Sequence, residues 1–413
     1  MTTPLQNLTT ANYPGGAQDF YPSRANALTD AQLAAVQALV QGAGNNSLLG
    51  MGDSIMRCQG IANNTASFLE YWAAASNGAM KIVGNLGTNG AKTADLISSQ
   101  LATAVASSAQ YVVVMEAAND ALNSVSVTTH RANMVTILQA LKAAGKVPIL
   151  VGAPPVSGYN IWQYNAADQQ TCIALGVKYI NPWAGCSLNG SWRDSTYSLD
   201  NVHPYPKASR IAGAAAWAAT QGMFVGTPDI AWTSALENSM LTNCLNLTNV
   251  AGVPTGWTGA AGLTHSCAEA GTGEVIGNWW KMTATGITGW QVNTRTGVAL
   301  PSGWAAGDTA RMSARLRSVG FEANGGAANA TYPTQGAMGC YISLAWTGGT
   351  AGSMILREID ADVNGVFSVD GIIPAGTTGA NFSVVVTQQA TVSGEFSVAQ
   401  LQVHNPTLAA RLA

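Results

Sequence analysis

The stretch Gly50-Met51-Gly52-Asp53-Ser54-Ile55-Met56 (GMGDSIM, residues 50–56) stands where an apolar run gives way to polar residues. Residues 47–51 predict a buried strand, and Ser54 follows at its carboxyl end, where open α/β sheets form their sites. Gly, Asp and Ser also make ordinary turns, so Ser54 alone is compatible with a nucleophile or a turn serine. A nucleophile needs a base, an orienting acid and oxyanion donors elsewhere in the chain.

Strand and helix patterns alternate on both sides of this stretch, from about residue 47 to residue 222. Further strands are predicted at residues 81–83, 111–115 (YVVVM), 147–151 (VPILV) and 178–180. Helices are predicted at residues 66–75, 93–105, 130–144, 166–175 and 207–220. Because the strands are apolar on both faces, we expect a parallel sheet between two helical layers, a three-layer α/β/α domain.

The pattern changes after residue 226. Helical periodicity nearly vanishes, and period-two runs with Gly, Thr and Asn turns take over, as at residues 381–387 and 395–403. Short strands at regular spacing predict an all-β sandwich or jelly roll. We therefore divide the chain into three parts: an N-terminal segment with a short helix (1–45), an α/β domain (46–226) and a β-sandwich domain (227–413).

The composition limits where the protein is expected to act and which partners it is expected to bind. Of 413 residues, 47% are hydrophobic, which argues against disorder, and only 9% are charged, where about 25% is usual. A surface wetted by hydroxyls and amides predicts an extracellular or virion-associated protein. The net charge is −3 without a Lys/Arg cluster, which disfavours nucleic-acid binding. No apolar run approaches the roughly 20 residues that a membrane span needs, so membrane insertion is not predicted. The first residues do not resemble a signal peptide.

The six cysteines are Cys58, Cys172, Cys186, Cys244, Cys267 and Cys340. None forms a CxxC pair, so a zinc site is not predicted. Disulfides between Cys172 and Cys186 or between Cys244 and Cys267 are compatible with the sequence, and free buried thiols are equally compatible.

Three further pieces follow later predicted elements. Gly90 ends NLGTNG (residues 85–90), where a bare backbone N–H can approach a ligand. Asn119 lies in EAAND (116–120), and its side-chain amide can donate to an oxyanion. Asp200 and His203 lie in DNVHP (200–204), a spacing that lets the acid fix the imidazole tautomer.

In this order the four pieces resemble the SGNH (GDSL-like) hydrolases over roughly residues 47–222. The resemblance implies a catalytic Ser54, Asp200 and His203. It also implies an oxyanion hole from Ser54, Gly90 and Asn119, with neither metal nor cofactor. The sequence departs from the family pattern at Ala117, where Gly is usual, and at Ile55, where Leu is common. Neither change removes a catalytic atom. We interpret Asp53 and Asp120 as supporting residues whose short side chains tie loop backbones around the site.

The resemblance predicts a serine esterase that removes acyl groups, chiefly O-acetyl, from a polysaccharide such as a bacterial capsule, lipopolysaccharide or plant glycan. The β-rich half is similar in pattern to carbohydrate-binding jelly rolls. The ion-poor composition is also similar to phage tail proteins, which implies a homo-oligomer, a trimer if tail-associated. Alternatives are a lipolytic or thioester hydrolase of the same family and a non-catalytic carbohydrate-binding adhesin.

Two further features have competing interpretations. Residues 360–365 (DADVNG) mimic the start of a calcium loop, but Gly371 stands at the twelfth position, so Asn364-Gly365 is predicted to form a hairpin turn. Five tryptophans can form a sugar-stacking platform or a core, and we favour the core for most of them. They are Trp279, Trp280, Trp290, Trp304 and Trp346.

Overall fold

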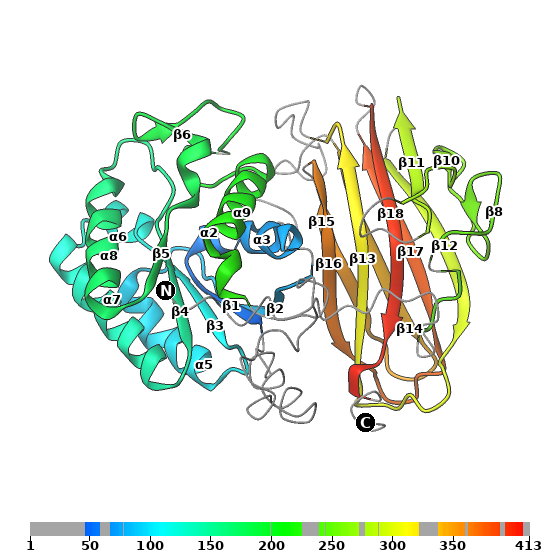
Figure 1. The fold of residues 1–413 in the computed structure, drawn as a ribbon, viewed down its shortest axis with the longest axis horizontal. Helices are drawn as coiled ribbons and strands as arrows, with labels where there is room; N and C mark the ends of the chain where they lie inside the picture. Colours follow the sequence, from blue (N-terminus) through cyan, green and yellow to red (C-terminus); the bar gives the residue numbers. More distant parts are fainter. Residues whose placement is uncertain are drawn as a thin grey trace, which may run out of the picture.

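The computed structural model describes residues 46–57, 67–76, 78–198, 200–224, 239–243, 245–271, 277–287, 289–321, 338–359, 362–388 and 393–407. The predicted N-terminal segment (1–45) lies outside these residues. Within them, an α/β domain is followed by a region of antiparallel sheet (Figure 1).

A five-stranded parallel sheet forms the centre of the α/β domain, in the order β2-β1-β3-β4-β5. Its strands are β1 (Ser47–Gly52), β2 (Lys81–Asn85), β3 (Tyr111–Met115), β4 (Val147–Val151) and β5 (Lys178–Ile180). The predicted parallel sheet is thereby confirmed. After β2 the chain crosses to the other side of β1 to form β3, so the connections that leave β1 and β3 diverge at the carboxyl ends of these strands. Such a point opens a crevice in an α/β sheet.

Helices cover both faces of this sheet because side chains alternate along its strands. In β3, Tyr111, Val113 and Met115 join one core cluster, while Val112 and Val114 join another. The first cluster is covered by α2 (Ser54–Arg57), α3 (Phe68–Ala75) and α9 (Pro206–Thr220). The second is covered by α5 (Leu101–Ala106), α7 (Val127–Ala143) and α8 (Ile161–Leu175). No helix among the described residues is long and apolar enough to cross a membrane.

The helix predicted at residues 93–105 is interrupted. It divides into α4 (Thr93–Asp95), a π-helical turn η6 (Leu96–Gln100) and α5. The wide turn ends at Gln100, whose buried amide accepts from the N–H of Gly52 at 2.9 Å and donates to its carbonyl at 2.8 Å. The π turn therefore fixes the backbone immediately before Asp53-Ser54, in keeping with the occurrence of such turns near functional sites.

The remaining helices and strands of the α/β domain are short. They are followed along the chain by two antiparallel sheets that share one core. The short elements are α6 (Ala118–Leu122), η7 (Pro182–Cys186), η8 (Gln221–Met223), β6 (Ser187–Leu188) and β7 (Ser191–Trp192). One sheet has the order β10-β11-β18-β13-β16: Thr264–Ser266, Trp280–Thr285, Ser393–His404, Thr309–Val319 and Val363–Ile372. The other has the order β12-β17-β14-β15: Gly289–Ala299, Gly379–Gln388, Met338–Thr347 and Ser353–Ile359. A small hairpin, β8 (Asn249–Val250) and β9 (Val253–Pro254), lies outside both.

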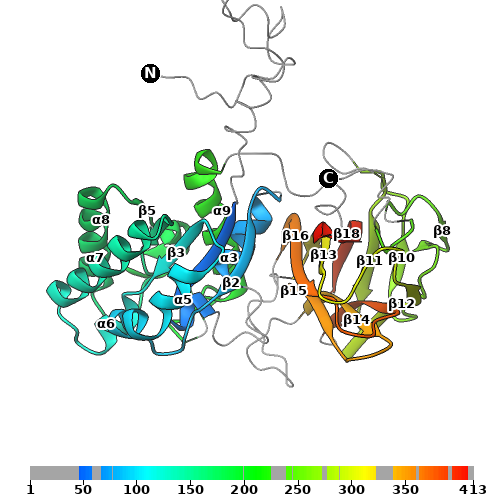
Figure 2. The ribbon, with the colours of Figure 1, turned by 90° about the horizontal axis from the view of Figure 1, so that it is seen from below.

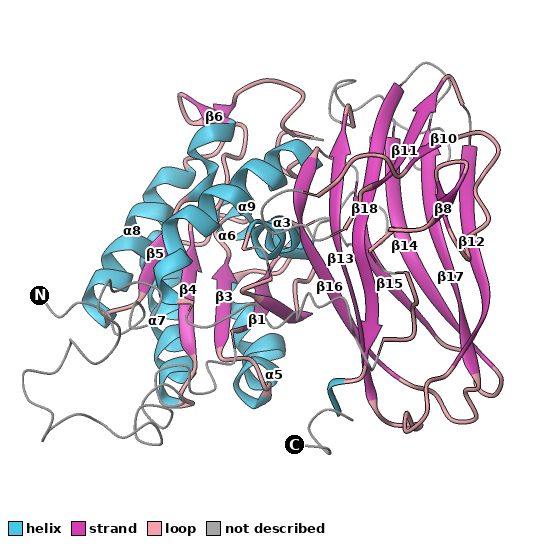
Figure 3. Cartoon of the chain, turned by 45° about the vertical axis from the view of Figure 1, so that its right-hand side comes forward, coloured by secondary structure: helices cyan, strands magenta, loops and turns pink. Residues whose placement is uncertain are grey.

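The core between these sheets makes the region a β-sandwich (Figure 3). Phe396 of β18 and Phe382 of β17 belong to the same buried cluster. The expected all-β region is confirmed, whereas its jelly-roll topology stays a prediction. Trp279, Trp280, Trp304 and Trp346 are buried, as favoured from the sequence, and Trp290 is half exposed.

One local prediction is wrong. Asn364-Gly365 lies inside β16, where Asn364 pairs with Arg317 of β13, and does not form a hairpin turn. Gly365 is needed there for a close approach, because a Cβ on it would stand 2.6 Å from the carbonyl oxygen of Ala74. Of the two alternatives left open for Cys172 and Cys186, the free buried thiols are confirmed, and burial raises the pKa of each to about 12. Cys267 is also free, and Cys244 and Cys58 lie outside the described residues.

The α/β domain and the sandwich meet where α3 and β2 face β16 (Figure 2). Tyr71 and Ala74 of α3 belong to the core cluster of the sandwich. Beside them, Lys81 pairs with Asp370 at 2.5 Å, and the guanidinium of Arg311 bonds the same carboxylate at 2.8 Å. Apolar packing and ion pairing thus join the two domains along one helix and one strand.

Gly213→Ala tests the packing of α9 against α3. A Cβ at Gly213 would lie 2.6 Å from the backbone nitrogen of Trp72. Alanine ordinarily stabilises a helix by about 1 kcal/mol relative to glycine, but overpacking costs about 1–3 kcal/mol. We expect urea unfolding to show a net loss of stability. Gly222→Ala is the matched control, because nothing lies within 4 Å of its Cβ position. A stabilised Gly213→Ala variant would contradict the packing.

Candidate active site

Ser54 begins α2 directly after β1, and its side chain is only 5% exposed. Asp53 caps this short helix: its Oδ1 accepts from the N–H of Ile55 at 2.8 Å and of Met56 at 3.4 Å. A carboxylate at a helix start satisfies N–H groups that have no helical partner. The strand end and the cap together hold the Ser54 hydroxyl at the carboxyl edge of the sheet.

His203 and Asp200 arrive at the same place on the loop before α9. The ring of His203 stands between the two other groups: Nδ1 is 2.7 Å from Asp200 Oδ2, and Nε2 is 2.9 Å from Ser54 Oγ. The other oxygen of Asp200 accepts from the backbone N–H of Val202 and of His203. The structure thus brings together the three residues that the sequence predicts as nucleophile, base and acid.

The ionisation of Asp200 suits an orienting acid. Burial opposes its charge, but hydrogen bonds from the backbone and ring of His203 outweigh burial and hold the pKa of Asp200 below its ordinary value. An ionised Asp200 accepts a hydrogen bond from Nδ1–H and keeps the proton on that nitrogen, so Nε2 is left as the acceptor that faces Ser54.

Asn119 lies in α6, after β3, on the opposite side of the crevice. Its Nδ2 donates to Asp53 Oδ2 at 3.2 Å, and its backbone N–H donates to Glu116 Oε1 at 2.9 Å. One bond fixes the side chain and the other fixes the backbone. Because an amide nitrogen carries two protons, one N–H of Asn119 stays available to a ligand.

Gly90 lies on the exposed loop after β2 with a φ of +74°. L side chains rarely adopt this conformation, which explains the glycine. The loop is anchored to β1 through the N–H of Thr88, which donates to the carbonyl of Gly52 at 3.1 Å. Gly90 therefore lies on a loop that is hydrogen-bonded to Gly52, two residues before Ser54. Its role as a donor to the oxyanion stays a prediction.

Residues 51–211 match the model of the GDSL-like Lipase/Acylhydrolase family. The α/β domain is thus similar to the GDSL-like hydrolases, and we call it the GDSL-like domain. The matched range begins in β1 and ends in α9, so it contains Ser54, Gly90, Asn119, Asp200 and His203.

Solved structures similar to the GDSL-like domain include three enzymes at low identity. A lipase/acylhydrolase from Enterococcus faecalis is 20% identical over 45% of this chain and 99% of its own, with a TM-score of 0.39. An esterase from Pseudoalteromonas is 16% identical over 43% and 98%, with a TM-score of 0.37. An acetylxylan esterase from Geobacillus stearothermophilus is 17% identical over 42% and 93%, with a TM-score of 0.35. No curated relative matches the chain.

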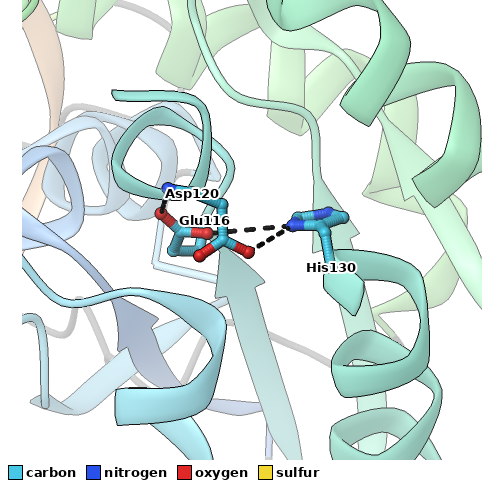
Figure 4. A group of neighbouring side chains, drawn as sticks. All are labelled: Glu116, Asp120 and His130. Atoms are coloured by element: carbon cyan, nitrogen blue, oxygen red, sulfur yellow. Dashed lines mark hydrogen bonds and ion pairs between the residues drawn. The ribbon is translucent and has the colours of Figure 1, made fainter. Parts of the chain in front are cut away.

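Behind Asn119, the GDSL-like domain buries a cluster of charged groups (Figure 4). His130 of α7 is fully buried, with Nδ1 2.9 Å from Asp120 Oδ2 and Nε2 2.9 Å from Asp168 Oδ1. Glu116 Oε2 lies 3.9 Å from the same Nδ1. Burial opposes the charged imidazole, but the hydrogen bonds to the two aspartates outweigh it and raise the pKa of His130 to about 10.

This cluster supports the backbone that carries Asn119. Glu116 Oε1 accepts from the N–H of Asn119 and Asp120, and Asp120 accepts from the N–H and hydroxyl of Thr93. Burial and the charges of Asp120 and Asp53 raise the pKa of Glu116 well above its ordinary value. Burial likewise raises the pKa of Asp53 to about 6.

Glu116, Asp120 and His130 are also the described residues whose ligand atoms lie close enough to hold a metal ion. However, both ring nitrogens of His130 are already within hydrogen-bond distance of a carboxylate. The imidazolium itself therefore supplies the positive charge between these acids.

Sequence reasoning gave no role to Glu116, His130, Asp168 or Gln100. A signal existed for His130, because it shares one helix face with Met134, Ile137 and Leu141, all of which are buried. A histidine on an apolar face must find buried partners. No pattern in the sequence shows that Asp168, on another helix, is one of them.

The raised pKa of His130 predicts a pH-dependent stability. Between the ordinary value of about 6.5 and about 10, the folded state binds a proton that the unfolded state has lost. The free energy of unfolding should therefore fall as pH rises, by up to about 1.4 kcal/mol per pH unit.

Urea unfolding at about pH 7 and about pH 7.8 measures this slope and stays below the pKa of about 8.5 at which cysteine thiols of the unfolded chain ionise. In His130→Gln the slope should disappear even though the variant is less stable throughout. A wild-type stability that is flat or rises over this interval would contradict a protonated His130.

Proposed function

We propose that the GDSL-like domain is a serine esterase that removes O-acetyl groups from a polysaccharide. One observation carries the proposal: the imidazole of His203 bridges Ser54 Oγ, at 2.9 Å, and Asp200 Oδ2, at 2.7 Å. This is the arrangement in which a serine hydroxyl can lose its proton to a base as it attacks an ester.

In the proposed mechanism, Ser54 Oγ attacks the carbonyl carbon of the ester and its proton passes to His203 Nε2. Asp200 accepts a hydrogen bond from Nδ1–H and stabilises the imidazolium. The tetrahedral oxyanion is bound by the backbone N–H groups of Ser54 and Gly90 and by the amide of Asn119. His203 then returns the proton to the leaving sugar hydroxyl, and the acyl group stays on Ser54 as an ester.

Water completes the proposed cycle. His203 Nε2 accepts a proton from the water as it attacks the acyl-enzyme, and a second oxyanion forms at the same donors. Its collapse returns the proton to Ser54 Oγ and releases the carboxylic acid. All of these steps use side chains and backbone groups of this chain, without a cofactor.

The choice of a polysaccharide as substrate rests on the neighbouring domain and on the composition of the chain. A β-sandwich packs directly against the GDSL-like domain, and only 9% of the residues are charged, which suits a polar, uncharged partner. We propose a jelly-roll topology for the sandwich, a glycan as its ligand, and an extracellular or virion-associated protein. A homotrimer would follow from a tail-associated setting.

Ser54→Ala should reduce acetate release from acetylated polysaccharides, and turnover of p-nitrophenyl acetate, by about 10⁴-fold or more, because the nucleophile is lost. Ser98→Ala is the matched control, since Ser98 is an exposed serine that only bonds the carbonyl of Asp95. Acetate release from a panel of acetylated polysaccharides measures the effect.

The same panel separates the alternatives. A strong preference for long-chain acyl esters or thioesters over acetylated glycans would exclude the polysaccharide and favour a lipolytic or thioester hydrolase. A wild type without activity on any ester would favour a non-catalytic adhesin, and activity that survives in Ser54→Ala would exclude the nucleophile.

Asn119→Ala should lower kcat for p-nitrophenyl acetate by about 10²–10³-fold, the usual effect of losing one oxyanion donor. The control is Asn123→Ala, which removes an amide four residues further on that bonds only the carbonyl of Asn119. Equal losses in the two variants would show that the amide of Asn119 supports the loop and does not bind the oxyanion.

A further inference from the structure

A pocket of about 550 Å³ opens at the carboxyl ends of β4 and β5. Its walls are the loop after β4, the first turn of α8 and the hairpin of β6 and β7. In Figure 3, β6 lies above α8 at this end of the domain. None of the groups assigned above to Ser54 chemistry lines it.

The pocket lining has no charged side chain. Two aromatic side chains are unusually exposed there: Trp162 at 70% and Tyr159 at 44%. Three exposed asparagines, Asn160, Asn181 and Asn189, add amide groups to the rim. Asn160 occupies the N-cap of α8 but makes no side-chain capping bond, so its amide is not used by the helix.

The pocket adjoins the loop that carries the imidazole. The backbone N–H of Ser157, in the pocket loop, donates to the carbonyl of Asn201 at 3.1 Å. Asn201 lies between Asp200 and His203, and Val202 packs against the core cluster that contains Val156. The pocket loop and the loop that carries His203 are therefore neighbours, which would let a sugar chain with its acyl group at Ser54 extend toward the pocket.

This lining fits one kind of ligand. A neutral sugar presents C–H faces that pack on aromatic rings and hydroxyl edges that bond amides. An acyl chain would strip water from the asparagine amides without replacing their hydrogen bonds, which is unfavourable. An anionic sugar would find no cation in the lining to pair with.

We propose that this pocket is a subsite for a neutral sugar unit of the acylated glycan, with Trp162 as its stacking platform and Asn160 as a hydroxyl partner. The proposal rests on the esterase function proposed above and adds the class of sugar and the residues that select it. It places the specificity for the glycan within the GDSL-like domain.

Trp162→Ala tests the subsite. For each variant, kcat/KM is measured on acetylated xylobiose, a neutral sugar ester, and on p-nitrophenyl acetate, which has no sugar. We expect the ratio of the two values to fall about tenfold, which corresponds to about 1.4 kcal/mol, chiefly through KM for the sugar ester. Asn160→Ala should lower the same ratio by a smaller factor. Since Trp162 is largely exposed, its replacement leaves the core untouched.

Ile173→Ala is the matched control: Ile173 is an exposed apolar residue on the same helix as Trp162 but does not line the pocket, so the ratio should not change. An unchanged ratio in Trp162→Ala, an equal fall in Trp162→Ala and Ile173→Ala, or a loss confined to p-nitrophenyl octanoate would each overturn the subsite. A wild type that hydrolyses acetylated oligogalacturonides better than acetylated xylobiose would overturn the preference for neutral sugars. Failure of the esterase proposal differs from all of these, since wild type would then hydrolyse none of the esters.

Discussion

The position of β1 between β2 and β3 is the constraint on which the site depends. Parallel strands place all their carboxyl ends on one edge, and the reversal of direction on either side of β1 makes the loops after β1 and β3 part from each other. Ser54 and Asn119 then face one crevice, and the loop before α9 closes it with His203, 149 residues away from Ser54. Side chains that are remote in sequence meet because the sheet order leaves them no other edge.

Electrostatics in this crevice are arranged in two layers. Near solvent, Asp200 stays ionised through hydrogen bonds from the His203 loop. In the interior, the carboxyl groups of Glu116, Asp120 and Asp168 surround one imidazolium, that of His130. Buried charges of this kind are retained only when each finds a partner, and loss of one partner leaves the others exposed to the full desolvation penalty. The buried cluster around His130 holds the backbone of the Asn119 segment in place. The outer pair, Asp200 and His203, lies nearer to solvent and can transfer protons.

The regular parts of the fold were predictable because local patterns determine them. The YVVVM run predicts both ends of β3 correctly. The predicted Ser54, Asp200 and His203 are joined by hydrogen bonds through the ring of His203. Features that depend on distant neighbours were not predictable. Gly365 has the sequence context of a turn residue, but its close contact is with Ala74 of the other domain. Gln100, at the end of the π turn, bonds the backbone of Gly52, which lies 48 residues away. The pairing of His130 with Asp168 likewise joins two helices whose relative register no local pattern contains.

The contact between α3 and β16 has a consequence for how the two halves evolve and work together. Because Tyr71 and Ala74 complete the hydrophobic interior of the sandwich, the sandwich is not a unit that recombination can exchange without repacking. Excision of the hydrolase half would expose apolar surface that is now dry. A polymer held on the sandwich would also meet the serine at a fixed angle and distance. Its local concentration would then be set by rigid geometry, whereas a tethered module samples a volume that depends on linker length.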